Sequence, residues 1–175
     1  MNVVTRAGIV LVTVMLIGTV SGCAAAPVGA PTPAPASSEA SPADSATCAE
    51  VAVVVNFGPL DAPPITACVA AGTAADVLAL AGVTTEGTLD YGDQVVCRVN
   101  ERPSPSEEVV IEGQEPFVES CATLNAAAYW ALWVKTSSGS DWEYAQEGAA
   151  TLELADGQAV GLVYTAGTDS VPPEG

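Results

Sequence analysis

Residues 128–144, AYWALWVKTSSGSDWEY, hold the side chains of this chain that are best suited to binding. They include all three tryptophans and two of the four tyrosines. Aromatic rings stack on flat ligands and on apolar peptides, and they also pair across the strands of small sheets. The first question is therefore whether this stretch forms a binding surface or part of a core.

Catalytic side chains are scarce by comparison. The chain has no histidine, which excludes histidine-based triads and histidine metal sites. A Ser–Lys pair could be drawn from Lys135 with Ser137, Ser138 or Ser140, but a lysine among serines is typical of a solvated hairpin turn. We therefore expect a protein that is not an enzyme and that needs no cofactor and no metal.

A strand over residues 128–135 would carry tryptophan on both faces, because successive side chains of a strand point in opposite directions. The more uniformly apolar face, which we expect to pack beneath a helix, comprises Trp130, Leu132 and Val134. The opposite face presents Tyr129 and Trp133 on either side of the small Ala131.

The second strand of this hairpin adds two more rings. With a turn centred on residues 137–138, Trp133 would lie opposite Trp142, and Ala131 would lie opposite Tyr144. A shift of register by one residue would separate these rings. The candidate ligand-binding residues are Tyr129, Trp133, Trp142 and Tyr144.

Two other roles for the rings stay open. The rings could pair across strands only to stabilise the sheet. Alternatively, residues 100–120, which hold six glutamates and three prolines, could cover them through Phe117 or Val118. We expect this acidic stretch to be a solvated loop with a short strand at 109–111, since its glutamates lack the spacing of a calcium-binding loop.

The elements that would position the hairpin follow from the hydrophobic pattern. Alternating valines over residues 51–57 and an apolar run over 65–70 predict a first hairpin. Thr73 and Asp76 are typical of a helix N-terminus, and Gly82 is typical of a C-terminal stop. Further strands are expected at 83–89, 94–99, 150–154 and 159–165. This order predicts an α+β chain in which one short helix covers one face of a sheet.

The N-terminal residues resemble the signal peptide of a bacterial lipoprotein. Arg6 precedes an apolar run over residues 7–20, which is short for a membrane span, and Val20-Ser21-Gly22-Cys23 resembles a lipobox. Residues 1–22 are thus predicted to be cleaved off and Cys23 to be lipidated, which anchors the chain at the extracytoplasmic face of the cell membrane. An ordinary secretory signal and a signal-anchor helix are the alternatives.

Composition divides the rest of the chain. Residues 23–47 comprise the predicted lipidated cysteine and a stretch rich in Ala, Pro and Ser. This composition predicts a disordered tether. The folded domain is expected over 48–166, and a disordered tail over 167–175. The net charge of −17 argues against nucleic acid and anionic lipid as partners. Such a charge suits a solvated exported protein, with a cationic partner as the functional alternative.

Four cysteines fall within the expected domain: Cys48, Cys68, Cys97 and Cys121. An even number in an exported domain predicts two disulfides. Their long spacing, in a chain without histidine, disfavours a zinc site. Three pairings of the four residues are open at this point.

Several motifs occur in a characteristic order: the helix TAADVLALAGV, the segment EGTLDYGDQVVCRVN, the strand AYWALWV and the closing DWEYAQEGAATLELADGQAVGLVY. In this order they resemble an uncharacterised bacterial domain family related to the C-terminal β domain of transcobalamin and intrinsic factor. The resemblance covers nearly all of residues 51–165 and implies a β-grasp-like mixed sheet. Two features depart from it: an Asn-Gly expected after the aromatic strand is absent, and the helical barrel that completes the corrinoid site of transcobalamin is missing. Cobalamin binding is therefore not implied.

The resemblance also implies the disulfide pairing and the class of function. In a β-grasp-like sheet the first two strands are neighbours, which implies a Cys48–Cys68 bond, and a Cys97–Cys121 bond would close the acidic loop. The function implied is a non-catalytic binding or accessory module for a flat cofactor-like ligand or for a membrane transporter. The alternative is a structural or protein–protein interaction module of the cell envelope without a small-molecule ligand.

Overall fold

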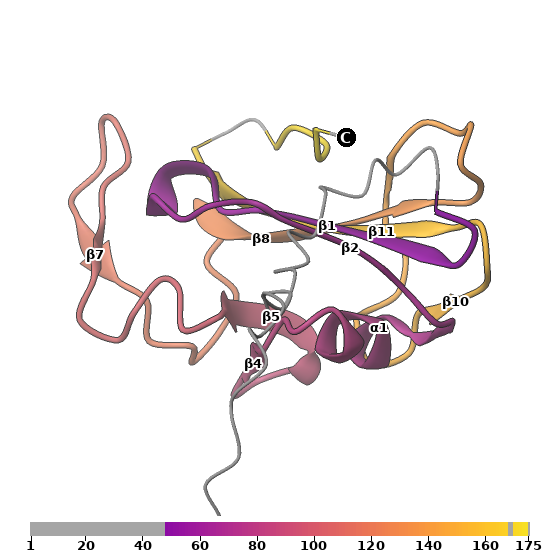
Figure 1. Ribbon diagram of the computed structural model, residues 1–175. Helices are drawn as coiled ribbons and strands as arrows, with labels where there is room; N and C mark the ends of the chain where they lie inside the picture. Colours follow the sequence, from indigo (N-terminus) through magenta and orange to yellow (C-terminus); the bar gives the residue numbers. More distant parts are fainter. Residues whose placement is uncertain (1–47, 168–169, 175) are drawn as a thin grey trace, which may run out of the picture. The chain divides into compact units, whose positions relative to one another are not determined.

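The computed structural model describes residues 48–167 and 170–174 (Figure 1). The predicted signal peptide, Cys23 and the tether lie outside these residues. Contacts divide the chain into two units, Met1–Ser38 and Glu39–Gly175, and every described residue belongs to the second unit. Within this described part, no helix has both the length and the apolar character needed to cross a membrane.

A mixed five-stranded sheet is the frame of the fold, with the strand order β2-β1-β11-β8-β9. Its strands are β1 (Val51–Asn56), β2 (Ile65–Val69), β8 (Ala128–Lys135), β9 (Glu143–Tyr144) and β11 (Ala159–Ala166). The first and last strands, β1 and β11, are parallel neighbours at the centre, and the other pairs are antiparallel. The aromatic strand β8 therefore lies between β11 and the short edge strand β9.

The expected first hairpin and helix are both present. A 3-10 helix, η2 (Gly58–Leu60), joins β1 to β2. Helix α1 (Ala74–Leu80) begins after Thr73, whose hydroxyl oxygen accepts a hydrogen bond from the Asp76 N–H at 3.2 Å. Gly82 follows with a φ of +75°, a left-handed conformation that ends helices. With only this short helix, the described domain is mostly β.

Three two-stranded ladders complete the fold. They pair β3 (Gly72–Thr73) with β10 (Glu153–Leu154), β4 (Thr85–Thr88) with β5 (Gly92–Val99), and β6 (Glu108–Val109) with β7 (Phe117–Val118). The strand expected at 150–154 is shorter than predicted because the N–H groups of Thr151 and Leu152 both donate to the Gly148 carbonyl and form a turn.

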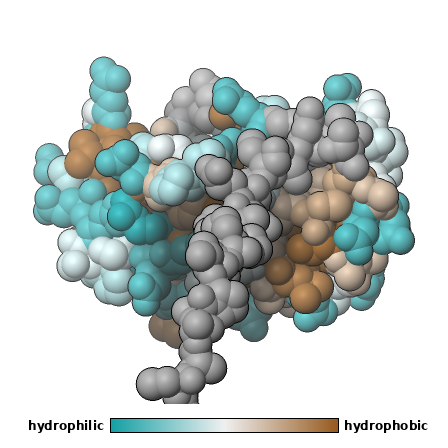
Figure 2. All heavy atoms as spheres, viewed as in Figure 1, coloured by the Kyte–Doolittle hydropathy of each residue, from teal (hydrophilic) through white to brown (hydrophobic). Residues whose placement is uncertain are grey.

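The main core lies between the sheet and the layer of α1, β4 and β5, which sits below the sheet in Figure 1. Val53, Leu78 and Leu162 are among its fully buried side chains. Residues 170–174 lie on the opposite side of the sheet, in yellow at the top of the figure. On the surface seen in Figure 2, hydrophobic area gathers over α1 and over the β6–β7 hairpin.

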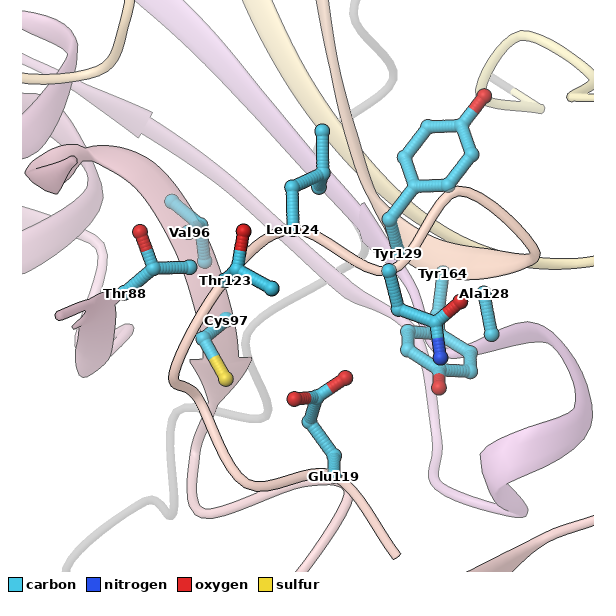
Figure 3. Close-up of a pocket in the computed structure, with 10 residues that line it drawn as sticks. Thr88, Val96, Cys97, Glu119, Thr123, Leu124, Ala128, Tyr129 and Tyr164 are labelled. Atoms are coloured by element: carbon cyan, nitrogen blue, oxygen red, sulfur yellow. The ribbon is translucent and has the colours of Figure 1, made fainter. Parts of the chain in front are cut away.

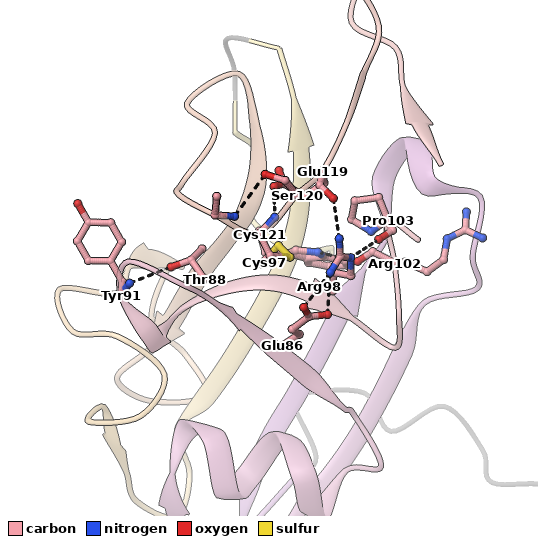
Figure 4. The surroundings of a disulfide bond; sticks show 12 residues. Glu86, Thr88, Tyr91, Cys97, Arg98, Arg102, Pro103, Glu119, Ser120 and Cys121 are labelled. Carbon is pink, nitrogen blue, oxygen red and sulfur yellow. Dashed lines mark hydrogen bonds and ion pairs between the residues drawn. A yellow bond between two sulfur atoms is a disulfide. The ribbon is translucent and has the colours of Figure 1, made fainter. Parts of the chain in front are cut away.

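Both disulfides are present in the implied pairing, Cys48–Cys68 and Cys97–Cys121. Disulfides are typical of proteins that work outside the reducing cytoplasm. The buried Arg98 sits beside the second bond (Figure 4). Its guanidinium donates to the Pro103 carbonyl at 2.9 Å and to both oxygens of Glu86 at 2.8 Å.

The acidic stretch 100–120 is less solvated than predicted. Arg98 donates to the Glu119 carbonyl at 2.6 Å, and the Glu119 carboxylate accepts the Cys121 N–H at 2.8 Å. Glu107 pairs with Arg102 at 2.9 Å and accepts the Ser104 N–H. The composition suggested a solvated loop, but two of these glutamates serve as acceptors for the arginines and backbone N–H groups that close it.

Candidate functional site

The division of the aromatic strand into two faces is confirmed. Trp130 is 4 % exposed and belongs to the main core, with Leu132 and Val134 packed against it. Trp133 belongs to a separate cluster with Ala131 and Val163 on the other face of the sheet. Tyr129 and Trp142 pack against this cluster. We call Tyr129, Ala131, Trp133, Trp142 and Val163 the outer cluster.

The predicted register of the hairpin is wrong by two residues. Trp133 lies opposite Tyr144 rather than Trp142, because the turn is centred about one residue later than residues 137–138. The serines close this longer turn: the Ser140 N–H and hydroxyl both donate to the Ser137 carbonyl. A shift of two residues preserves the faces of a strand, so the four candidate rings still meet on the same side.

The rings make specific contacts with one another. Trp133 and Tyr144 are stacked, with their centroids 4.1 Å apart and an interplanar angle of 25°. The hydroxyl oxygens of Tyr129 and Tyr144 are 3.4 Å apart, and this contact is the main cause that raises the pKa of Tyr129 above its ordinary value, with burial second. The ammonium of Lys135 lies 4.9 Å from the centroid of Trp142.

The four rings differ in their exposure. Trp133 is only 6 % exposed, Tyr129 and Trp142 are half-buried, and Tyr144 is 42 % exposed. The indole nitrogens of Trp133 and Trp142 are both buried, and neither has a hydrogen-bond partner in the described part of the chain. Two buried N–H donors are thus left unsatisfied on one small surface, which is uncommon in folded proteins.

The segment that covers the outer cluster is the C-terminal one and not the acidic loop. Phe117 packs against the main core. The tail was predicted to be disordered from residue 167, but Pro173 is buried, and a Cβ added to Gly161 would collide with its ring. The same added Cβ would lie 3.3 Å from Cζ3 of Trp142. Both rings therefore close over Gly161, and the Ser170 hydroxyl, 2.9 Å from that of Thr165, holds the start of this segment.

A groove runs along the outer edge of β8, beside the exposed ring of Tyr144. It has a volume of about 190 Å³ and is lined on one side by β8 and Tyr144, and on the other by Val95, Leu124 and Gly148. Strand β9 pairs with β8 only at Trp133 and Val134, so the preceding half of the β8 edge has no strand neighbour.

The backbone of β8 is available at this groove. The Ala145 N–H donates to the Leu132 carbonyl, and the Gly167 N–H donates to the Ala127 carbonyl across the other edge. Since backbone groups alternate between the two edges of a strand, the N–H and carbonyl of Trp130 point toward the groove. No hydrogen bond from another described residue engages them.

A second, smaller pocket lies between Glu119 and Tyr164 (Figure 3). Its volume of about 10 Å³ holds roughly one water molecule. Burial, and then the charges of Glu119 and Glu107, raise the pKa of Tyr164, whose hydroxyl has no partner among the described residues. A cavity of this size suits an ordered water and not an organic ligand.

Cys97, Glu119 and Cys121 bring ligand-type atoms within 4.8 Å of one another. The two sulfurs are bonded to each other, so neither is the thiolate that a metal would need. The cluster is best described as a disulfide with a buried carboxylate that accepts the N–H of Cys121.

No protein-family profile, curated protein or solved structure matches this chain. The candidate site therefore depends on its own geometry.

Sequence reasoning missed three parts of this geometry: the Arg98 network, the groove at the β8 edge and the packing of Pro173 over Gly161. Only the last had a visible signal. Gly161 interrupts an otherwise apolar strand, and a glycine inside a strand often marks the close approach of another group.

Proposed function

We propose that this chain is a non-catalytic binding module of the bacterial cell envelope, held at the extracytoplasmic face of the membrane by a lipid on Cys23. The lipobox-like sequence supports the anchor, and the two disulfides support a location outside the cytoplasm. Candidate partners are a membrane transporter or another envelope protein. The net charge of −17 disfavours nucleic acid.

We also propose that the fold is β-grasp-like and related to the C-terminal β domain of transcobalamin. The sheet order, with β1 and β11 as parallel central strands and with α1 packed against one face, supports this assignment. The β1–β2 hairpin tied by Cys48–Cys68 supports it as well.

The observation that carries the binding function is the open half of the β8 edge beside an aromatic-lined groove. An extended peptide that adds to a sheet edge gains backbone hydrogen bonds and places alternate side chains in neighbouring hollows. Trp130 offers the backbone groups, while Tyr144 and Leu124 offer apolar walls. A flat ligand could use the same walls by stacking on Tyr144.

The proposal is tested with a matched pair of leucines. Leu124 lines the groove and is 45 % exposed, whereas Leu89 is exposed but lies outside the lining. Binding of cyanocobalamin, haem and an extended Val-Thr-Val-Thr peptide is measured by isothermal titration. At least one probe should bind, Leu124→Ala should weaken it about fivefold, and Leu89→Ala should leave it unchanged, since one lost apolar contact is worth about 1 kcal/mol.

An alternative function is a structural or protein–protein interaction module of the envelope. The burial of Trp133 favours it, because a ring that is 6 % exposed stabilises the sheet before it can stack on a ligand. Photo-crosslinking in intact cells from residue 124 separates the two functions. A protein adduct without binding of any small probe would support the alternative, and absence of both would contradict both proposals.

A further inference from the structure

The outer cluster already holds a proline. Pro173 is the one buried residue of the described C-terminal segment 170–174, and it rests over Gly161 next to Trp142. Its neighbour Pro172 is exposed, and Val171 is 62 % exposed. The segment thus places a single proline ring on an aromatic surface and leaves its other apolar side chains in solvent.

Pro173 leaves two features of this surface unused, a pair of indole N–H donors and an adjacent hollow. The buried indole N–H groups of Trp133 and Trp142 lack acceptors in the described part of the chain. A hollow of about 320 Å³ also runs beside Val171 and Pro172, along Asn56, Gly58 and Val163. A segment that filled this hollow and presented a carbonyl to the indoles would bury more apolar area and satisfy at least one donor.

These features match the way aromatic surfaces recognise proline-containing segments. Such segments are extended before they bind, lose little entropy on binding, and present carbonyl oxygens that aromatic N–H and O–H groups can donate to. Gly161 contributes by its lack of a side chain, since any Cβ there would fill the space of the proline ring.

The charge of the surroundings indicates what should flank the proline. Asp141 is exposed next to Trp142, the ammonium of Lys135 lies 4.9 Å from the centroid of that ring, and the net charge of the chain is −17. The chain's own segment places the acidic Glu174 directly after Pro173, which is a poor match to a chain of strongly negative charge. Lysine or arginine at that position would add electrostatic attraction.

We propose that the outer cluster with Gly161 is a docking site for a proline-containing, basic segment of a partner protein, and that Pro173 occupies this site in the free chain. The partner displaces residues 170–174, which act as an internal competitor. This inference goes beyond the groove at the β8 edge. Tyr129 and Ala131 border both sites, but Trp142, Gly161 and Pro173 lie outside the groove lining.

The test uses the mature chain and the labelled peptide KKSVPPKK, which keeps the Ser-Val-Pro-Pro of residues 170–173 and replaces the acidic end by lysines. Binding is measured by fluorescence anisotropy at low salt. Pro173→Ala releases the internal competitor, and Pro172→Ala is its matched control because Pro172 is exposed. Since an attached competitor acts at a high effective concentration, we expect the P173A chain to bind at least about tenfold tighter than the wild-type and P172A chains.

Peptide variants show which proline of the peptide binds over Gly161. The P173A chain should bind KKSVAPKK like the parent peptide and KKSVPAKK at least about tenfold more weakly, because only the second proline enters the seat. Adding Gly161→Ala to the P173A chain should abolish binding, whereas adding Leu124→Ala should not, which separates this site from the groove. Failure of the P173A chain to bind KKSVPPKK, or equal binding of all three peptides, would overturn the proposal.

Discussion

Trp130 and Trp133 lie on the same strand and are both buried, yet their surroundings differ in kind. The Trp130 indole donates to the Arg102 carbonyl at 3.1 Å, and its ring meets the edges of Phe57 and Tyr164. The Trp133 indole donates to no described residue, its ring stacks on Tyr144, and Pro173 of the segment 170–174 lies over Gly161, the residue opposite Trp133 on β11. The inner face is closed by a helix and a hairpin, and the outer face is closed by the rings of Tyr144, Trp142 and Pro173.

The two faces of β8 differ in what buries their tryptophans. The inner face also holds a buried polar group without a described partner, the Tyr164 hydroxyl, so the contrast between the faces is in what covers them: many core side chains on one face and a few rings on the other. In our proposal, the outer face is the part of the molecule whose cover is exchanged.

The largest expected contrast comes from truncating each tryptophan. Trp130→Ala should destabilise the domain by about 3–5 kcal/mol, because it opens a cavity in the main core and removes the hydrogen bond from the indole to the Arg102 carbonyl. Trp133→Ala should cost about 1–3 kcal/mol, because its cluster is small and its indole N–H loses no hydrogen bond. Urea unfolding of the oxidised protein measures both values, and equal losses would remove the distinction between the faces.

Truncating one side chain that covers each face of the sheet, Leu78 on the inner face and Pro173 on the outer face, should give a second contrast. Leu78 of α1 is fully buried, so Leu78→Ala should cost about 2–5 kcal/mol. Pro173→Ala should cost about 1.5 kcal/mol, because a segment whose docking weakens peptide binding about tenfold stabilises the folded chain by about 1.4 kcal/mol. Thermal unfolding of the two variants provides the comparison. A larger loss for P173A than for L78A would show that the segment is an integral part of the core.

Alkaline pH should separate the two faces through Tyr164 and Tyr129. Both pKa values are raised in the folded state, so the unfolded chain ionises first, near pH 10. Stability should be constant below that pH and fall as the pH rises above it. Tyr164→Phe should remove most of this loss and Tyr129→Phe only a small part, because Tyr164 is buried and Tyr129 is half-exposed. Unfolding titrations from pH 8 to 11 measure the slopes, and an unchanged slope in Y164F would contradict the assignment.

The smallest effect is expected at the rim of the outer cluster. Tyr144→Phe keeps the stack on Trp133 and removes only the hydroxyl near Tyr129, so stability should change by no more than about 0.5 kcal/mol. The pKa of Tyr129 should fall toward its ordinary value, since the Tyr144 contact is the main cause of its rise. Ultraviolet titration of the tyrosines detects this change, and no shift would exclude the contact in solution.

Local periodicity predicted the faces of β8 well, because the alternation of a strand survives any shift by two residues. The pairing partner of Trp133 was predicted wrongly, because it depends on the length of a serine-rich turn, which periodicity does not define. The Thr73 cap and the Gly82 stop of α1 were predictable because both depend on neighbouring residues.

Contacts between distant segments were not predictable from one sequence. Pro173 meets Gly161 through the folded sheet, and the composition of residues 167–175 suggested only disorder. The walls of the groove come from β5, β8 and the loop at Gly148, which no local pattern links.

Hydrogen exchange of the three indole N–H protons, followed by NMR, tests the contrast between the faces most directly. On Pro173→Ala, exchange at Trp133 and Trp142 should accelerate at least about tenfold, because opening their cover no longer has to displace the proline, while exchange at Trp130 should stay unchanged. Uniform acceleration of all three indoles, or no change at Trp133 and Trp142, would contradict an outer face whose cover is separable from the fold.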